Sequence, residues 1–119
     1  MEYLGKQLKN KNLIHNNFID SVKEREYHAS TAYGNLVAIP HPLMPLAKQT
    51  FIYIITMDKP IAWEDKEAQI IFCLGLKKNT TINLEKVYQN LSEIINDYSK
   101  VLKLLEADSK ESFKKIFSP

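Results

Sequence analysis

The chain has 119 residues and a mass of 13.8 kDa, which is enough for one hydrophobic core but not for two. Hydrophobic residues make up 45% and charged residues 25%, an ordinary globular balance that argues against disorder. The net charge of +2 is too small for the basic face of most nucleic-acid-binding domains, and no apolar run approaches the ~20 residues of a membrane helix. We therefore expect one cytoplasmic domain without membrane insertion or direct nucleic-acid contact.

The N-terminal part of the chain predicts two helices and a loop. Two leucines four residues apart indicate a short helix over Glu2–Lys9. A second helix is expected over Phe18–Glu26, because apolar residues form a stripe along it and Asn17 is a suitable N-cap. The next segment, His28–Gly34, is rich in Ser, Thr, Ala and Gly, and it predicts a loop.

Three short apolar segments follow, and each predicts a strand. They are Leu36–Ile39, Phe51–Met57 and Gln69–Leu76, which are rich in β-branched or aromatic residues. The near-continuous apolarity at the start of the second segment predicts strands covered on both faces, and hence helices packed on a sheet. Cys73, the only cysteine, is expected to be a small core residue. Trp63 is expected to cover an edge of the core, with stacking on a partner as the alternative.

The last third of the chain changes to a helical period. Apolar residues recur at intervals of three and four between Leu84 and Ile95, which predicts an amphipathic helix. Asn96 and Asp97 interrupt this helix. The next apolar face consists of Tyr98, Val101, Leu102 and Leu105. A capping-box pattern over Asp108–Glu111 predicts a final short helix. The elements together predict a single layered α/β (α+β) domain.

A histidine between two prolines is the most informative residue for chemistry. Pro40 has no amide hydrogen and should end the preceding strand, while Pro42 disfavours a helical backbone at His41. The imidazole is therefore expected at the rim of the sheet, where active sites of α/β proteins collect. A neutral imidazole can attack phosphorus, so His41 is a candidate phosphoacceptor.

Other residues of the same segment are suited to binding phosphoryl oxygens. Arg25 offers a planar, permanently charged guanidinium, and the hydroxyls of Ser30 and Thr31 and the amides around Gly34 offer further donors. From the residues alone, a solvated surface histidine and a surface arginine remain alternatives. Histidines occur at 15, 28 and 41, without the close pair that a zinc site needs, so we expect no metal.

The segment from Arg25 to His41 resembles the signature of the mannitol/fructose-type enzyme IIA family of the bacterial sugar phosphotransferase system. In that signature an Arg-Glu pair, Ser-Thr, Gly-Asn and Ala-Ile-Pro-His follow in this order, as they do here without gaps. Lys59–Trp63 and Leu104–Ala107 agree as well, so the resemblance covers most of the chain. The forms of His41-Pro42 and Lys59–Trp63 look most like the enzyme IIA-like C-terminal domain of BglG-family transcription antiterminators.

The resemblance implies a fold, a site and partners. It implies a mixed sheet flanked by helices, with His41 as the phosphorylated residue and Arg25 as its charge partner. It implies phospho-HPr as the donor, enzyme IIB or covalently linked regulatory domains as the acceptor or target, and no cofactor. The family usually begins with a further strand, so residues 1–119 are expected to form an enzyme IIA-like domain that lacks it.

Three functions remain open at this point. Transport-type members of the family usually carry a second histidine near the start of the long helix, whereas residues 79–84 contain none. This difference favours a phosphoacceptor that regulates a sugar-responsive transcription antiterminator. The alternatives are a free-standing enzyme IIA that passes phosphate to enzyme IIB during sugar uptake, and a degenerate interaction module without chemistry.

Overall fold

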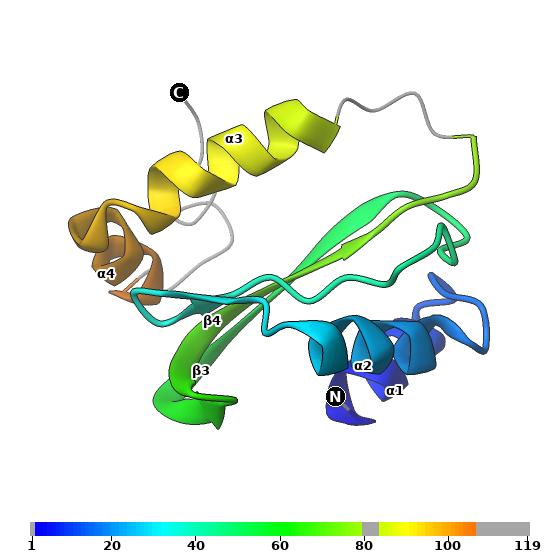
Figure 1. The fold of residues 1–119 in the computed structure, drawn as a ribbon, viewed down its shortest axis with the longest axis horizontal. Coiled ribbons are helices and arrows are strands. Elements are labelled where there is room, and N and C mark those ends of the chain that lie inside the picture. The colour runs from blue at the N-terminus through cyan, green and yellow to red at the C-terminus, as the bar shows by residue number, and fades with distance from the viewer. Residues whose placement is uncertain (1, 80–83, 107–119) are drawn as a thin grey trace.

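A β-sheet lies between two pairs of helices. The computed structural model describes residues 2–79 and 84–106. Helices α1 (Glu2–Asn10) and α2 (Phe18–His28) cover one face of the sheet, and α3 (Leu84–Ile95) and α4 (Tyr98–Glu106) lie on the other side (Figure 1). The expected mixed sheet flanked by helices is confirmed.

The sheet has four strands in the order β1-β2-β4-β3. They are β1 (Ala32–Gly34), β2 (Val37–Ala38), β3 (Phe51–Trp63) and β4 (Lys66–Gly75). Strand β2 runs parallel to β4, whereas the β1–β2 and β3–β4 pairs are antiparallel. Because β4 has a neighbour on each side and helices above and below, it is the structural centre of the domain.

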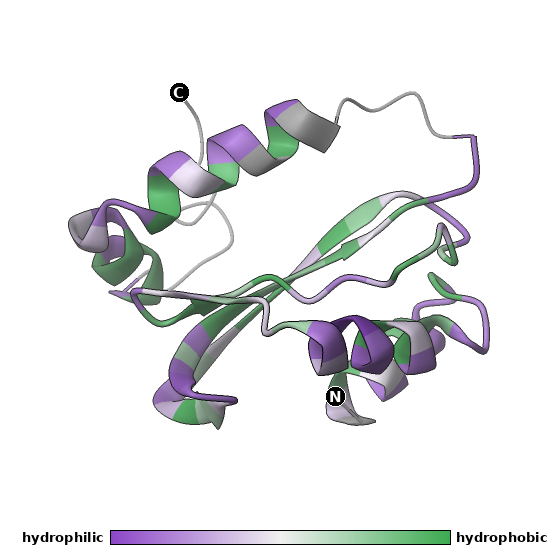
Figure 2. Ribbon diagram, in the orientation of Figure 1, coloured by the Kyte–Doolittle hydropathy of each residue, from purple (hydrophilic) through white to green (hydrophobic). Residues whose placement is uncertain are grey.

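Side chains of β4 point alternately to the two faces of the sheet, so the core has two parts. Ile70, Phe72 and Leu74 point into the cluster formed with α3 and α4, and Cys73 points into the cluster formed with α1 and α2. Figure 2 shows hydrophobic residues along the strands and on the side of α3 that faces the sheet. Burial raises the pKa of the Cys73 thiol to about 12, so the cysteine is an inert core residue, as expected.

Two predictions around α2 need correction. The helix extends to His28 and Ala32–Gly34 form β1, so the predicted loop is confined to residues 29–31. Asn17 stands at the N-cap position but makes no side-chain cap hydrogen bond. Its backbone angles (φ −94°, ψ 8°) lie outside the extended region of a typical capping residue, although its carbonyl accepts the first bond of the helix, from the Ser21 amide.

Strand β3 is longer and less covered than predicted. It continues past Met57 and through Pro60 to Trp63. A proline is tolerated there because β3 is an edge strand and its register with β4 shifts between Thr56 and Ile61. The expectation of cover on both faces holds for β4 but is wrong for β3, where Ile52, within the apolar run itself, is 46% exposed.

The apolar face of α4 also differs from the prediction. The buried residues are Val101 and Leu104, whereas Tyr98 and Leu102 are 50% and 39% exposed. Apolar residues occur on several sides of this helix, so their spacing does not define its phase, which packing against α3 and the sheet decides. The helix predicted from Asp108 lies outside the described residues.

Candidate functional site

His41 lies where the chain leaves the sheet. Strand β2 ends at Ala38, and Ile39 and Pro40 are buried. Pro40 cannot donate, but its carbonyl accepts from the Leu74 amide at 3.0 Å and so holds the chain against β4. The next residue, His41, is partly exposed. The strand thus ends before the histidine, as the two prolines predict.

The imidazole of His41 is oriented by its own segment. Its Nδ1 lies 3.0 Å from the backbone carbonyl oxygen of Ile39. A carbonyl can only accept, so Nδ1 carries the hydrogen and Nε2 carries the lone pair. This tautomer makes Nε2 the nucleophilic nitrogen of the ring.

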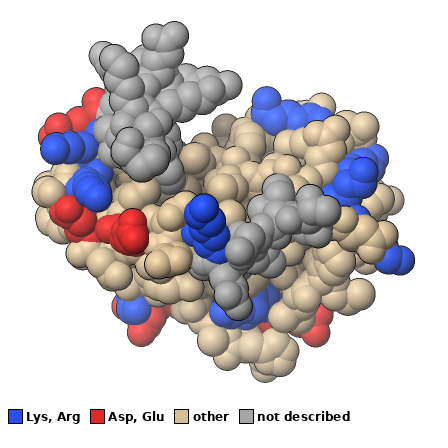
Figure 3. Space-filling view, turned by 90° about the horizontal axis from the view of Figure 1, so that it is seen from above, with Lys and Arg blue, Asp and Glu red and all other residues tan. Residues whose placement is uncertain are grey.

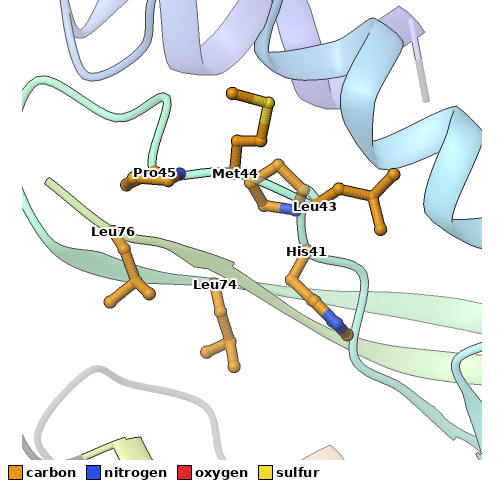
Figure 4. Close-up of a pocket in the computed structure, with 7 residues that line it drawn as sticks. His41, Leu43, Met44, Pro45, Leu74 and Leu76 are labelled. Carbon is orange, nitrogen blue, oxygen red and sulfur yellow. The ribbon is translucent and has the colours of Figure 1, made fainter. Parts of the chain in front are cut away.

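A small apolar pocket adjoins the histidine. Its lining residues are His41, Pro42, Leu43, Met44, Pro45, Leu74 and Leu76. In Figure 4 the side chains of Leu74 and Leu76 point in the same direction as His41, away from Met44 and Pro45, and Leu43 turns toward the helix. The pocket volume of about 100 Å³ is far below the ~300–1,000 Å³ of pockets that hold small ligands. Leu43 and Met44 are 49% and 62% exposed, so the rim is open to a partner surface.

Helix α2 anchors the segment that follows His41. The Leu43 amide donates to Oγ of Ser21, which is buried, at 2.8 Å. Arg25 follows Ser21 by four residues and therefore lies on the same side of α2. The contact described for its guanidinium is a hydrogen bond to the carbonyl oxygen of Ala29. The approach of Arg25 to a phosphoryl group on His41 thus stays a prediction. The sequence reasoning missed Ser21, although a polar residue beside the apolar stripe was a usable signal.

The remaining predicted donors have local partners or lie elsewhere. Oγ of Ser30 accepts from the Ala32 amide at 3.1 Å, and both Thr31 donors, its amide and its hydroxyl, are bound to the Glu26 carboxylate. Gly34 has φ +102°, which suits a glycine, and is the last residue of β1, just before the turn to β2. It lines a hollow with residues 64–67, at the opposite end of β2 from His41.

The sequence around His41 is free of acidic residues. There is no Asp or Glu between residues 27 and 57, or between residues 68 and 84. Lys48 and Lys77 follow the two segments that line the pocket. An isolated β-bridge between Ala47 and Lys77 brings them together. Lysine side chains occur at the right-hand end of the face in Figure 3, which is the end at which the chain leaves β4 in Figure 1. Such a surrounding favours a negatively charged group.

Two other kinds of site find no support in the described part of the chain. None of its helices is long and apolar enough to cross a membrane. Within residues 2–79 and 84–106, no three His, Cys, Asp or Glu side chains are grouped so that they could hold a metal ion.

Comparison with known proteins identifies the family. Residues 1–119 match the family described as "Phosphoenolpyruvate-dependent sugar phosphotransferase system, EIIA 2". The chain belongs to this family. The resemblance stated from the Arg25–His41 segment is thereby confirmed, and the protein is an enzyme IIA-type phosphotransfer domain.

The relatives of this enzyme IIA domain include regulators and phosphotransferase components. It is 34% identical over 117 residues to the "Probable licABCH operon regulator" of Bacillus subtilis, a match covering 98% of the chain and 18% of that protein. It is 26% identical to the mannitol-specific phosphotransferase enzyme IIA component of Halalkalibacterium halodurans, over 88% of the chain and 72% of that protein. The chain thus spans less than a fifth of the length of the regulator.

Solved structures show the same fold. The crystal structure of IIA mannitol from Escherichia coli matches with a TM-score of 0.76 and 18% identity, over 96% of this chain and 83% of that chain. Enzyme IIA mannitol in its complex with phosphorylated enzyme IIB from Escherichia coli matches with a TM-score of 0.77 and 16% identity, over 95% and 81% of the two chains. At these identities the likeness concerns the fold.

Proposed function

We propose that this enzyme IIA domain accepts a phosphoryl group from phospho-HPr on Nε2 of His41, in the cytoplasm. The observation that carries the proposal is the Nδ1 contact with the Ile39 carbonyl, which leaves the lone pair on Nε2 of a partly exposed ring. The small apolar pocket beside the ring also fits an exchange between two protein surfaces better than binding of a free sugar.

The proposed step is one in-line transfer between two imidazoles. The Nε2 lone pair of His41 attacks phosphorus, and the P–N bond to the histidine of HPr breaks as the new P–N bond forms. The electron pair of the broken bond stays on the donor nitrogen. The ring of His41 gains positive charge because it keeps the hydrogen on Nδ1, and the Ile39 carbonyl stabilises that charge.

Arg25 is the proposed partner of the transferring group. It lies on the same side of α2 as Ser21, which holds the segment after His41. A change of side-chain rotamer therefore moves its guanidinium between the Ala29 carbonyl and that segment. A guanidinium matches two phosphoryl oxygens at once. The lysines beyond the pocket add a long-range attraction for the anion.

We further propose that the phosphorylated domain acts as a signal in a larger regulator. Support comes from the similarity to the operon regulator and from the lack of a histidine in residues 79–84. A phosphoryl group adds about two negative charges next to sequence segments that carry no acidic residue, which is enough to attract or repel a covalently linked regulatory domain.

Labelling with phosphoenolpyruvate, enzyme I and HPr tests the phosphoacceptor. We expect one acid-labile, alkali-stable phosphate per chain, and no label in His41→Ala. His28→Ala is the matched control, because His28 is an exposed imidazole at the end of α2 and should leave labelling unchanged. Undiminished labelling of His41→Ala would end the proposal.

Onward transfer separates regulation from transport. We expect a persistent phospho-form that passes little phosphate to purified enzyme IIB domains, because no second imidazole is present in residues 79–84 to assist departure. The measurement follows phosphate on both chains after mixing. Rapid and complete transfer to an enzyme IIB domain would replace the regulatory function with the transport function.

A further inference from the structure

The carboxylate of Glu26 accepts from three donors, which belong to two other parts of the fold. Its Oε2 accepts from the Thr31 amide at 3.0 Å and from Nε1 of Trp63 at 3.2 Å, and its Oε1 accepts from the Thr31 hydroxyl. Glu26 lies in α2, Thr31 precedes β1 and Trp63 ends β3. One charged group therefore fixes the end of the helix to the loop and to the edge strand, through hydrogen bonds of the stronger, charge-assisted kind.

Thr31 extends this network to the imidazole. Its carbonyl oxygen accepts from the Ile39 amide at 3.1 Å. The Ile39 carbonyl oxygen, in turn, is the group that accepts from Nδ1 of His41 at 3.0 Å. Four residues, from Glu26 through Thr31 and Ile39 to His41, thus form one hydrogen-bonded series. Because each bond holds the backbone of the next residue in place, a shift of one residue displaces the next.

We propose that Glu26 is a positioning residue for the phosphoacceptor. By holding Thr31, it fixes the Ile39 carbonyl at the place where that oxygen selects the Nδ1–H tautomer of His41 and directs Nε2 outward. The inference rests on the proposed phosphorylation of His41. The tautomer of the His41 imidazole can, however, be measured without any phosphoryl transfer.

Burial makes the carboxylate hard to replace. Thr31 is only 2% exposed, so water does not readily substitute for a lost acceptor. Glutamine has nearly the same size but only one oxygen. Turned one way, its NH₂ group faces the Thr31 amide; turned the other way, it can donate to the Thr31 hydroxyl oxygen, but the charge that strengthens all three bonds is lost. Glu26→Gln should therefore loosen the loop while preserving the helix.

The test combines a rate with a spectroscopic signature. In Glu26→Gln, single-turnover phosphorylation from phospho-HPr should fall by about 10-fold, the lower end of the loss that follows removal of a group orienting a metal-binding histidine. The ¹⁵N resonances of the His41 ring should shift from the Nδ1–H form toward a mixture of tautomers. Glu24→Gln is the matched control, since it removes the same charge from an exposed position on the same helix and should change neither quantity.

Threonine variants guard against a failure of Glu26→Gln to fold. Thr31→Val removes the hydroxyl donor and should alter the tautomer ratio in the same direction, and Thr31→Ser should restore it. Wild-type tautomer ratios and rates in folded Glu26→Gln and Thr31→Val, with only a lower unfolding midpoint, would overturn the proposal. An altered tautomer ratio in a protein whose wild type accepts no label would support the positioning role and reject the phosphoacceptor function.

Discussion

The two helical layers of this enzyme IIA domain differ in the kind of contact they make with the sheet. On the α3–α4 side, the described core consists of apolar residues, among them Leu91, Ile94 and Leu104. The α1–α2 side has a comparable apolar cluster around Phe18, but α2 also makes polar contacts. The buried polar side chains among the described residues are Ser21 and Thr31. Ser21, in α2, binds the segment after His41, and Thr31, in the segment before His41, binds α2.

This difference separates stability from phosphoryl transfer. Hydrophobic contacts tolerate small shifts, because burial of apolar area has no directional requirement. A hydrogen bond weakens steeply when its geometry changes. Substitutions in the α3–α4 layer should therefore change the fraction of folded protein, whereas substitutions of the polar residues of α2 should change the rate of a protein that remains folded.

The largest expected effect of the α2 layer is that of Arg25→Ala. Loss of a charged contact made in the transition state typically lowers a rate by ~10²–10³-fold. The guanidinium is partly exposed and contacts only a helix-end carbonyl in the described structure, so the free energy of unfolding should change little. Single-turnover phosphorylation from phospho-HPr and urea unfolding measure the two quantities.

Arg25→Lys sharpens this result. Lysine keeps the charge but cannot bind two phosphoryl oxygens with one planar group, so it should recover only part of the rate. A wild-type rate in Arg25→Ala would remove Arg25 from the site and leave the lysines and backbone donors to stabilise the phosphoryl group.

The corresponding substitution in the other layer is Leu104→Ala. Leu104 is 1% exposed and packs in the α3–α4 core, so the change should lower the free energy of unfolding by about 2–5 kcal/mol. Leu102→Ala is the matched control in the same helix, because Leu102 is 39% exposed and should cost much less. Urea unfolding gives the stabilities, and labelling is corrected for the folded fraction. A slower rate per folded Leu104→Ala molecule would contradict the separation of the two layers.

The sequence predicted the parts of the fold in which a periodic apolar pattern is long. The boundaries of α3 and the centre of β4 agree with their patterns, because many residues of one period specify them together. Strands β1 and β2 have only three and two residues, so their pairing with the rest of the sheet, and not their own pattern, determines them. The same applies to Pro60, which the β3 edge tolerates only because the register shifts there.

The candidate site was predictable to the extent that its residues are adjacent in sequence. The prolines beside His41 already indicate a strand end, and the resemblance adds Arg25. The contacts of Glu26 with Thr31 and Trp63 join residues up to 37 positions apart, and no local pattern reports them. Ser30, Thr31 and Gly34 are suitable donors by type. In the fold, however, Oγ of Ser30 contacts a backbone amide, Thr31 contacts a carboxylate, and Gly34 adopts a positive φ next to a turn.

The smallest expected effect concerns the start of α4, again in the apolar layer. Oδ1 of Asp97 accepts from the hydroxyl and amide of Ser99 and from the Lys100 amide. The Ser99 hydroxyl is the largest cause that lowers the pKa of this carboxyl below its usual value, with the backbone bonds and the Lys100 charge adding to it. The folded state therefore binds the proton less tightly than the unfolded state. It follows that the stabilisation is present above the unfolded pKa of ~3.9 and is lost as the pH falls through the lower folded value.

Asp97→Asn tests this pH dependence with little change of shape. Asparagine can still accept at the N-cap, so the substitution removes mainly the charge. The wild type should be slightly more stable than Asp97→Asn at pH 7, and the difference should vanish toward pH 2–3, as measured by urea unfolding across that range. Asp58→Asn is the control, because it removes the same charge from an exposed position of β3, away from any helix terminus. The phosphorylation rate at pH 7 should be the same in all three proteins, because the described side-chain hydrogen bonds of Asp97 stay within the start of α4. A difference in stability that persists at pH 2 would mean that the shape of the cap, and not its charge, stabilises α4.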